Sequence, residues 1–174
     1  VKAGASYLQG WTFEDGITVS DSELESAVRQ ADVIVFGCGG SSVRDFESVY
    51  NGAGAIVETK GKYMDCGEGC DLAELKLLPC QAELLRKLSS YGKPIVSIVL
   101  SGRAYVLTEI VENSNAVLWC GYPGCEGAAA VLDTIFGKKN NFGRLSFSLP
   151  KSVGQLPIYY NHKRTARYID MDER

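Results

Sequence analysis

The chain has 174 residues, of which 45% are hydrophobic and 22% are charged, which is the composition of one ordinary globular domain. Its net charge of -3 gives no electrostatic reason to expect binding to nucleic acid or to an anionic membrane surface. No apolar run is long enough to cross a bilayer, so a membrane-spanning protein is not expected.

The predicted elements alternate between helices and strands. A polar S-D-S-E run at 20–23 predicts a helix start, because a small capping residue is followed by Glu three positions later. Continuous apolar runs rich in β-branched residues are typical of buried parallel strands. In chain order, we expect a helix to about residue 31, a strand at 32–38, a helix at 79–91, a strand at 95–100, a helix at 106–113, a strand at 116–120, a helix at 126–136 and an edge or half-buried strand at 145–149.

This alternation predicts an α/β fold with an open, mostly parallel sheet covered on both faces. We expect one three-layer α/β/α sandwich with a flavodoxin-like sheet over residues 1–174. Neither end carries a start or stop signal, so the chain reads as a fragment of a longer protein. Ligands on such sheets bind beyond the carboxyl ends of the strands, where glycine-containing turns follow three of the predicted strands. The long irregular segment 43–75 is expected beside them, and loops of this length are usually functional or disordered.

One carboxylate in that segment, Glu68, stands between two glycines in the motif C-G-E-G-C-D at 66–71. Small neighbours let a carboxylate approach a ligand closely. On the residues alone, an idle solvated Glu is the simpler interpretation, because surface Glu is common. Glu58 competes with it, but the nearby Lys60 favours a charged carboxylate, which does not suit a general acid. Asp45 beside Arg44 reads as a local ion pair.

Other motifs give weaker signals. The six cysteines allow disulfides, but the expected burial of Cys38 and Cys120 favours mostly free thiols. The cysteines at 66, 70 and 80 have neither a nearby histidine nor a second CxxC-type pair, so the signal for a zinc site is weak. No cofactor is expected. His162 is the only histidine, and no Ser-His-Asp arrangement can be proposed. Trp119 and Tyr122, at a strand end, are candidates for stacking on a sugar, with core packing the default for Trp119.

Five motifs, spread in order over nearly the whole chain, match one known pattern. The first motif, at 119–127, reads W-C-G-Y-P-G-C-E-G and resembles W-x-x-Y/A-G-Q-E-G. The second, at 130–137, reads A-V-L-D-T-I-F-G and is similar to A-I-A-D-V-L-F-G. The run at 141–161 looks like N-P-S-G-R-L-P-x-S-x-P-x-S-V-G-Q-L-P-x-Y-Y-N. Upstream, the motif at 39–46 reads G-G-S-S-V-R-D-F and resembles G-G-S-S-A-R-D-F. The motif at 66–71 reads C-G-E-G-C-D and resembles S-G-E-G-Y/F-D. These patterns belong to glycoside hydrolase family 3, of the β-glucosidase and β-xylosidase type.

The resemblance implies the second, α/β-sandwich domain of a retaining enzyme that removes β-linked sugars from non-reducing ends. In this family a (β/α)8 barrel supplies an Asp nucleophile, the sandwich supplies the acid/base on a loop, and a fibronectin-type domain often follows. The resemblance assigns the acid/base to Glu68 and makes Arg44 and Asp45 candidate substrate-binding residues. Because a retaining glycosidase needs two carboxyl groups about 5 Å apart, we expect this chain to be inactive without its barrel partner. The family branch often works outside the cytoplasm, so a periplasmic or secreted location is expected.

The chain departs from the family pattern at several positions. Cys66 stands where Ser is usual, and Leu72 where Arg is usual, which removes an expected partner for a carboxylate. These changes motivate an alternative, a non-catalytic carbohydrate-binding or interface domain in which Glu68 has lost its role. A third hypothesis is a stand-alone flavodoxin-like module that binds a small ligand at 39–42.

Overall fold

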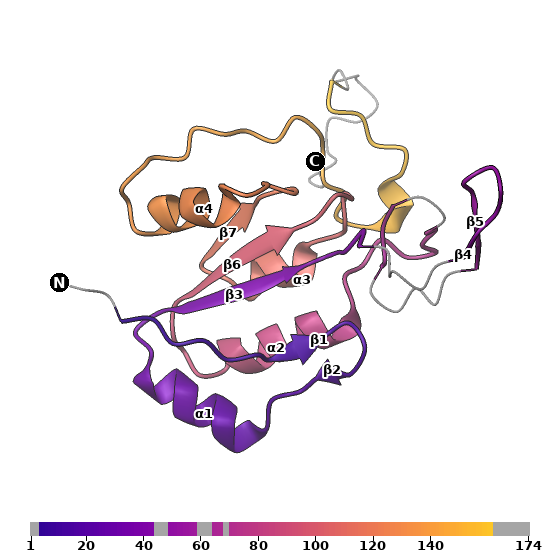
Figure 1. Cartoon of the computed structure of the whole chain (residues 1–174). Coiled ribbons are helices and arrows are strands. Elements are labelled where there is room, and N and C mark those ends of the chain that lie inside the picture. The colour runs from indigo at the N-terminus through magenta and orange to yellow at the C-terminus, as the bar shows by residue number, and fades with distance from the viewer. Residues whose placement is uncertain (1–3, 44–48, 59–63, 68–69, 162–174) are drawn as a thin grey trace.

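The computed structural model describes residues 4–43, 49–58, 64–67 and 70–161 (Figure 1). At its centre is a three-stranded parallel sheet in the order β3-β6-β7. β6 (Ile95–Leu100) pairs with β3 (Ile34–Gly39) on one side and with β7 (Ala116–Trp119) on the other. β6 is almost continuously buried, as its apolar, β-branched sequence predicted for a central strand. The predicted parallel sheet is therefore confirmed.

Four α-helices accompany the sheet in the described part of the chain. They are α1 (Asp21–Gln30), α2 (Pro79–Ser89), α3 (Thr108–Glu112) and α4 (Gly127–Ile135). Figure 1 shows α1 and α2 on one side of the sheet and α4 on the other, which is the arrangement of an α/β sandwich. The four helices lie in the four regions where the sequence predicted them.

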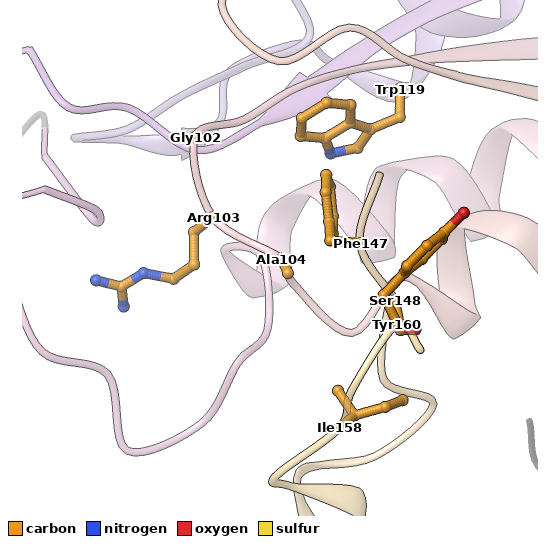
Figure 2. A pocket seen from close by; sticks show the side chains of 8 residues that line it. All are labelled: Gly102, Arg103, Ala104, Trp119, Phe147, Ser148, Ile158 and Tyr160. Atoms are coloured by element: carbon orange, nitrogen blue, oxygen red, sulfur yellow. The ribbon is translucent and has the colours of Figure 1, made fainter. Parts of the chain in front are cut away.

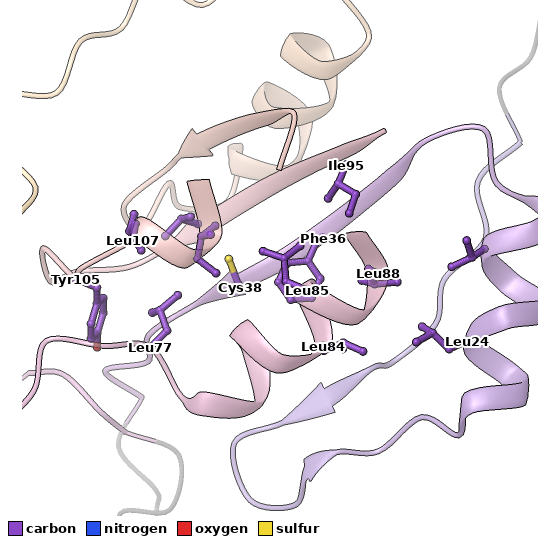
Figure 3. Close-up of a cluster of buried hydrophobic side chains, with 13 residues drawn as sticks. Leu24, Phe36, Cys38, Leu77, Leu84, Leu85, Leu88, Ile95, Tyr105 and Leu107 are labelled. Carbon is purple, nitrogen blue, oxygen red and sulfur yellow. The ribbon is translucent and has the colours of Figure 1, made fainter. Parts of the chain in front are cut away.

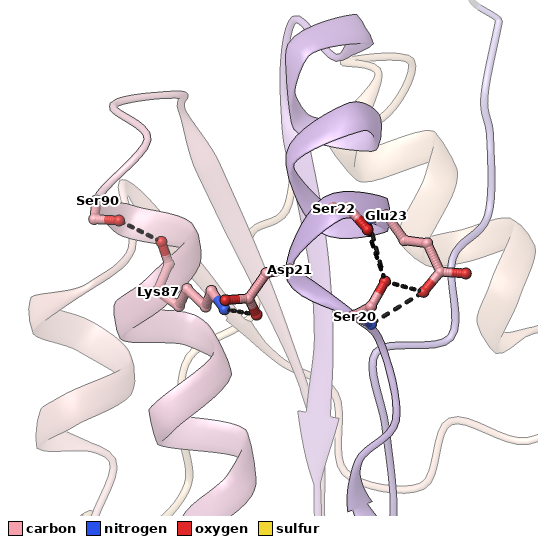
Figure 4. Close-up of polar contacts among 6 residues, drawn as sticks. All are labelled: Ser20, Asp21, Ser22, Glu23, Lys87 and Ser90. Carbon is pink, nitrogen blue, oxygen red and sulfur yellow. Dashed lines mark hydrogen bonds and ion pairs between the residues drawn. The ribbon is translucent and has the colours of Figure 1, made fainter.

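The start of α1 follows the predicted capping pattern. Ser20 Oγ accepts the backbone N–H of Glu23 at 3.3 Å, and Glu23 Oε2 accepts the backbone N–H of Ser20 at 3.0 Å (Figure 4). This exchange satisfies two N–H groups that the first helical turn leaves without partners. An ion pair between Asp21 and Lys87 joins α1 to α2.

The hydrophobic core lies between the sheet and the helices on the α2 side. Leu85 from α2 and Val99 from β6 are completely buried, with 0% exposure. Their neighbours in the core, many of them drawn in Figure 3, are Leu24, Val28, Phe36, Cys38, Leu77, Leu84, Leu88, Ile95, Tyr105, Leu107 and Ile110. The leucines of α2 recur three or four residues apart, so they form one stripe on the helix that faces the sheet.

One predicted strand is wrong. Residues 145–149 alternate apolar and polar side chains but form no strand. Instead, the Phe147 ring packs edge-on against Trp119 of β7, with ring centroids 5.0 Å apart. This ring contact holds the segment at the end of the sheet without backbone pairing.

Several short elements escaped prediction. β1 (Trp11–Thr12) and β2 (Gly16–Ile17) form an antiparallel pair, as do β4 (Val49–Tyr50) and β5 (Ile56–Glu58) inside the segment expected to be irregular. A short 3-10 helix, η1 (Val153–Gln155), lies near the end of the described chain. Strands of two or three residues are too short to show a period in the sequence.

Candidate active site

Three turns meet at the carboxyl end of the parallel sheet. The backbone N–H of Gly40, after β3, donates to the Leu100 carbonyl at 3.0 Å, and the Ser101 N–H, after β6, donates to the Gly121 carbonyl at 3.2 Å. Gly39 has a φ of 145°, and a Cβ there would lie 1.8 Å from the Leu100 oxygen. Glycine is required at this point because any side chain would collide with the neighbouring strand.

A buried glutamine fixes the end of β3. Gln81 of α2 has 0% exposure, and its side-chain amide bonds both backbone groups of Gly39. The amide oxygen accepts the Gly39 N–H at 2.8 Å, and the amide nitrogen donates to the Gly39 carbonyl at 2.9 Å. Sequence reasoning missed this residue. The available signal was a polar side chain on the apolar stripe of α2, three residues before Leu84.

Residues 64–67 are tied to the turn after β3. The Ser41 carbonyl accepts the backbone N–H groups of Asp65 and Cys66 at 2.9 and 3.1 Å. In return, the Ser41 N–H donates to Asp65 Oδ1 at 2.6 Å. Asp65 was not singled out in the sequence, yet its half-buried carboxylate lies at the carboxyl end of the sheet. This network places the chain leading into the C-G-E-G-C motif against β3.

The turn after β7 reaches the same segment through Tyr122. Its hydroxyl lies 3.0 Å from Sγ of Cys66, which is buried. The ring passes close over Gly102, where a Cβ would come within 2.6 Å of Tyr122 Cε2. Partial desolvation, reinforced by the hydrogen bond with Cys66, raises the pKa of the Tyr122 hydroxyl, so the hydroxyl stays neutral at physiological pH.

The turn after β6 contacts the other side of the motif through Arg103. Its guanidinium donates to the carbonyl oxygen of Cys70. The arginine backbone is fixed by Ser101, which is fully buried and accepts the Arg103 N–H at 3.1 Å while donating to the Arg103 carbonyl at 2.7 Å. The Cys70 N–H in turn donates to the Gly67 carbonyl at 3.2 Å.

The predicted site residues themselves lie mostly outside the described part of the chain. These are Glu68, Arg44 and Asp45, together with Lys60 and His162. The structure does bring their described neighbours Ser42, Cys66, Gly67 and Cys70 to the carboxyl end of the sheet. Glu58 belongs to β5, and Figure 1 shows the β4–β5 hairpin projecting away from the sheet.

A cavity of about 370 Å³ opens beside this cluster (Figure 2). Its lining residues are Gly102, Arg103, Ala104, Trp119, Phe147, Ser148, Ile158 and Tyr160. The Trp119 ring packs on Phe147 and against the hydrophobic core, which agrees with the core packing expected from the sequence. The buried indole N–H of Trp119 has no hydrogen-bond partner among the described residues. Figure 2 shows the Arg103 side chain extending away from these two rings.

All six cysteines are free thiols. Burial raises the pKa of Cys38 to about 12, so this thiol behaves as an unreactive core residue. Within the described ranges, no group of three or more His, Cys, Asp or Glu side chains is arranged to hold a metal ion. Similarly, none of the helices described here has the length and apolar character needed to cross a membrane.

Comparison with known proteins decides the family. Residues 4–173 match the family model described as the glycosyl hydrolase family 3 C-terminal domain. The chain belongs to this family. It is 34% identical over 110 residues to a β-xylosidase of Formosa agariphila, covering 63% of this chain and 15% of that protein. It is 31% identical over 145 residues to a periplasmic β-glucosidase of Salmonella typhimurium, covering 83% of this chain and 16% of that protein.

Solved structures of β-glucosidases share the fold. The β-glucosidase of Listeria innocua in complex with isofagomine matches with a TM-score of 0.67 and 30% identity, over 86% of this chain and 18% of that one. A β-glucosidase from Erythrobacter marinus matches with a TM-score of 0.69 and 27% identity, over 97% of this chain and 24% of that one. This family 3 domain thus spans less than a quarter of the proteins that it resembles.

Proposed function

We propose that the chain is the second domain of a retaining, exo-acting β-glycosidase that hydrolyses terminal, non-reducing β-D-glycosyl residues. Glu68 is the acid/base of the reaction, and the barrel domain of the same protein supplies the Asp nucleophile. Family membership supports this function, as do the relatives named β-glucosidase and β-xylosidase. The substrates are β-linked oligosaccharides or glycosides, with glucose or xylose at the non-reducing end.

The observation that carries the proposal is the anchoring of the described residues on both sides of Glu68. Cys66 is bonded to Ser41 and Tyr122, and Cys70 to Arg103, so groups from all three strand ends hold them. Position 68 is two residues from each anchor, and the chain advances at most about 3.8 Å per residue. A carboxylate there suits a ligand site beyond the carboxyl end of a parallel sheet, where such sites are found.

The proposed chemistry needs two carboxyl groups about 5 Å apart on opposite faces of the scissile bond. The barrel Asp attacks the anomeric carbon and forms a glycosyl-enzyme, while Glu68 protonates the departing oxygen. Glu68 then removes a proton from the water that releases the sugar with retained configuration. A chain without the barrel lacks the nucleophile and should not turn over substrate.

A second candidate, a non-catalytic carbohydrate-binding or interface domain, has one observation in its favour. Leu72, at the position where the family usually has Arg, is half-buried and packs against the hydrophobic core. An apolar side chain that packs inward cannot pair with a carboxylate, so one expected neighbour of the acid/base is lost. Activity of the complete enzyme separates the two functions.

We also propose a periplasmic or secreted location, because one relative carries the name periplasmic β-glucosidase. The presence of the complete enzyme in a periplasmic or culture-medium fraction would test this. Exclusive recovery with a cytoplasmic marker would contradict it.

The acid/base role is tested by leaving-group dependence in the full-length enzyme. Glu68→Ala should lower kcat/KM by roughly 10²-fold or more for a phenyl β-glycoside, whose leaving group needs protonation. The loss should be far smaller for the 2,4-dinitrophenyl glycoside, whose leaving group needs none. Glu58→Ala is the matched control, because it removes a carboxylate from the same segment of sequence. If Glu58→Ala shows the selective loss and Glu68→Ala does not, the assignment is wrong.

A further inference from the structure

We infer that Arg103 and Tyr122 are positioning residues for the acid/base segment, one holding each end of the C-G-E-G-C motif. This inference rests on the proposed role of Glu68. Neither residue was assigned this role from the sequence. Both belong to turns that follow strands of the parallel sheet, so they connect the ends of β6 and β7 to described residues at the two ends of the motif.

Tyr122 holds the amino-terminal end of the motif. Its hydroxyl contacts Cys66 Sγ at 3.0 Å, and Cys66 is only 3% exposed, so the contact is shielded from water. The bare backbone of Gly102 lets the Tyr122 ring lie close enough to make this contact, because a Cβ would collide with the ring. Tyr122 as a whole is 52% exposed, so only part of its side chain is enclosed by these contacts.

Arg103 holds the carboxyl-terminal end. Its guanidinium donates to the Cys70 carbonyl, a charge-assisted hydrogen bond of the stronger kind. Two hydrogen bonds with the buried Ser101 fix the arginine backbone. The side chain extends away from the Trp119 and Phe147 rings (Figure 2). The Cys70 carbonyl is a backbone group, so this contact does not depend on the cysteine side chain.

The described residues at both ends of the motif are therefore held by the ends of the sheet strands. The Cys70 N–H also donates to the Gly67 carbonyl, which links the two ends to each other. A general acid must be placed accurately, because a displacement of about 1 Å can cost roughly 10²-fold in rate. Loss of either contact should therefore weaken proton donation selectively, while attack by the nucleophile on the other domain continues.

The experiment uses the full-length enzyme and two aryl glycosides of whichever sugar the wild type hydrolyses. Arg103→Ala should lower kcat/KM for the phenyl glycoside by roughly tenfold to a hundredfold, with a much smaller loss for the 2,4-dinitrophenyl glycoside. Arg103→Lys keeps a donor and should recover part of the loss. Tyr122→Phe keeps the ring over Gly102 and should show the same selectivity. Arg29→Ala, an exposed arginine on α1, is the control and should leave both rates unchanged.

The outcomes are distinguishable. Equal losses on both glycosides in Arg103→Ala and Tyr122→Phe, with no recovery in Arg103→Lys, would show that these residues only support folding and would overturn the inference. Glu68→Ala is measured in parallel. If Glu68→Ala is selective and the Arg103 variants are not, positioning fails while the proposed function stands. If Glu68→Ala itself is not selective, the proposed function fails and the inference falls with it.

Discussion

Gln81 offers the sharpest test of how the site is held to the fold. Replacing Gln81 with Leu keeps a side chain of similar size but removes both hydrogen bonds to Gly39, made at 2.8 and 2.9 Å. Gly39 is buried, so its N–H and carbonyl would each lose a partner that water cannot replace. A buried backbone group without a partner costs about 1–3 kcal/mol. Allowing for the apolar gain of the leucine, we expect a loss of about 3 kcal/mol in the free energy of unfolding.

The assay is urea unfolding of the chain, comparing Gln81→Leu with Gln30→Leu. Gln30 is exposed on α1 and bonds only within its own helix, to Ser26, so its replacement should change stability by less than about 0.5 kcal/mol. A loss below about 1 kcal/mol in Gln81→Leu, or one no larger than that of the control, would refute the reasoning. It would mean that Gly39 is not held by the glutamine in solution.

Further predictions follow from burial and close approach. Leu85→Ala should destabilise the chain by about 3 kcal/mol in urea unfolding, because Leu85 has 0% exposure; a loss under about 1 kcal/mol would contradict its place in the core. Gly102→Ala should displace the Tyr122 ring and speed alkylation of Cys66, at a stability cost of only about 1 kcal/mol; unchanged labelling would contradict the close packing. At about pH 8, mass spectrometry should find the exposed Cys125 alkylated first and Cys38 unmodified until unfolding, because burial raises the pKa of Cys38 to about 12; early labelling of Cys38 would contradict its burial.

The main elements could be predicted because their signals are local. Ser20 and Glu23 form the capping box that their spacing indicates, and the buried run of β6 is central in the sheet. The parallel pairing agrees with this pattern, because a helix lies between β3 and β6 and another between β6 and β7. The alternation of apolar and polar residues at 145–149 predicted a strand wrongly, because Phe147 packs its ring on Trp119 and the segment makes no strand pairing.

The contacts that organise the site could not be predicted because they join residues far apart in sequence. Gln81 is 42 residues from Gly39, and Tyr122 is 56 residues from Cys66. No local pattern encodes such pairs, although a glutamine on an apolar helical stripe was a usable signal. The carboxyl-end location of the site was predictable from fold rules, and the contacts of Cys66 and Cys70 agree with it. The role of Glu68 came from family resemblance and stays a prediction.

The most direct test of the central claim is azide rescue of Glu68→Ala in the full-length enzyme. With a 2,4-dinitrophenyl β-glycoside, the variant should form the glycosyl-enzyme but release it slowly, because no base activates water. Azide needs no such base, so it should raise the turnover rate and yield a β-glycosyl azide with retained configuration. If azide neither raises the rate nor appears in the product, while Glu58→Ala is rescued, the acid/base is not Glu68.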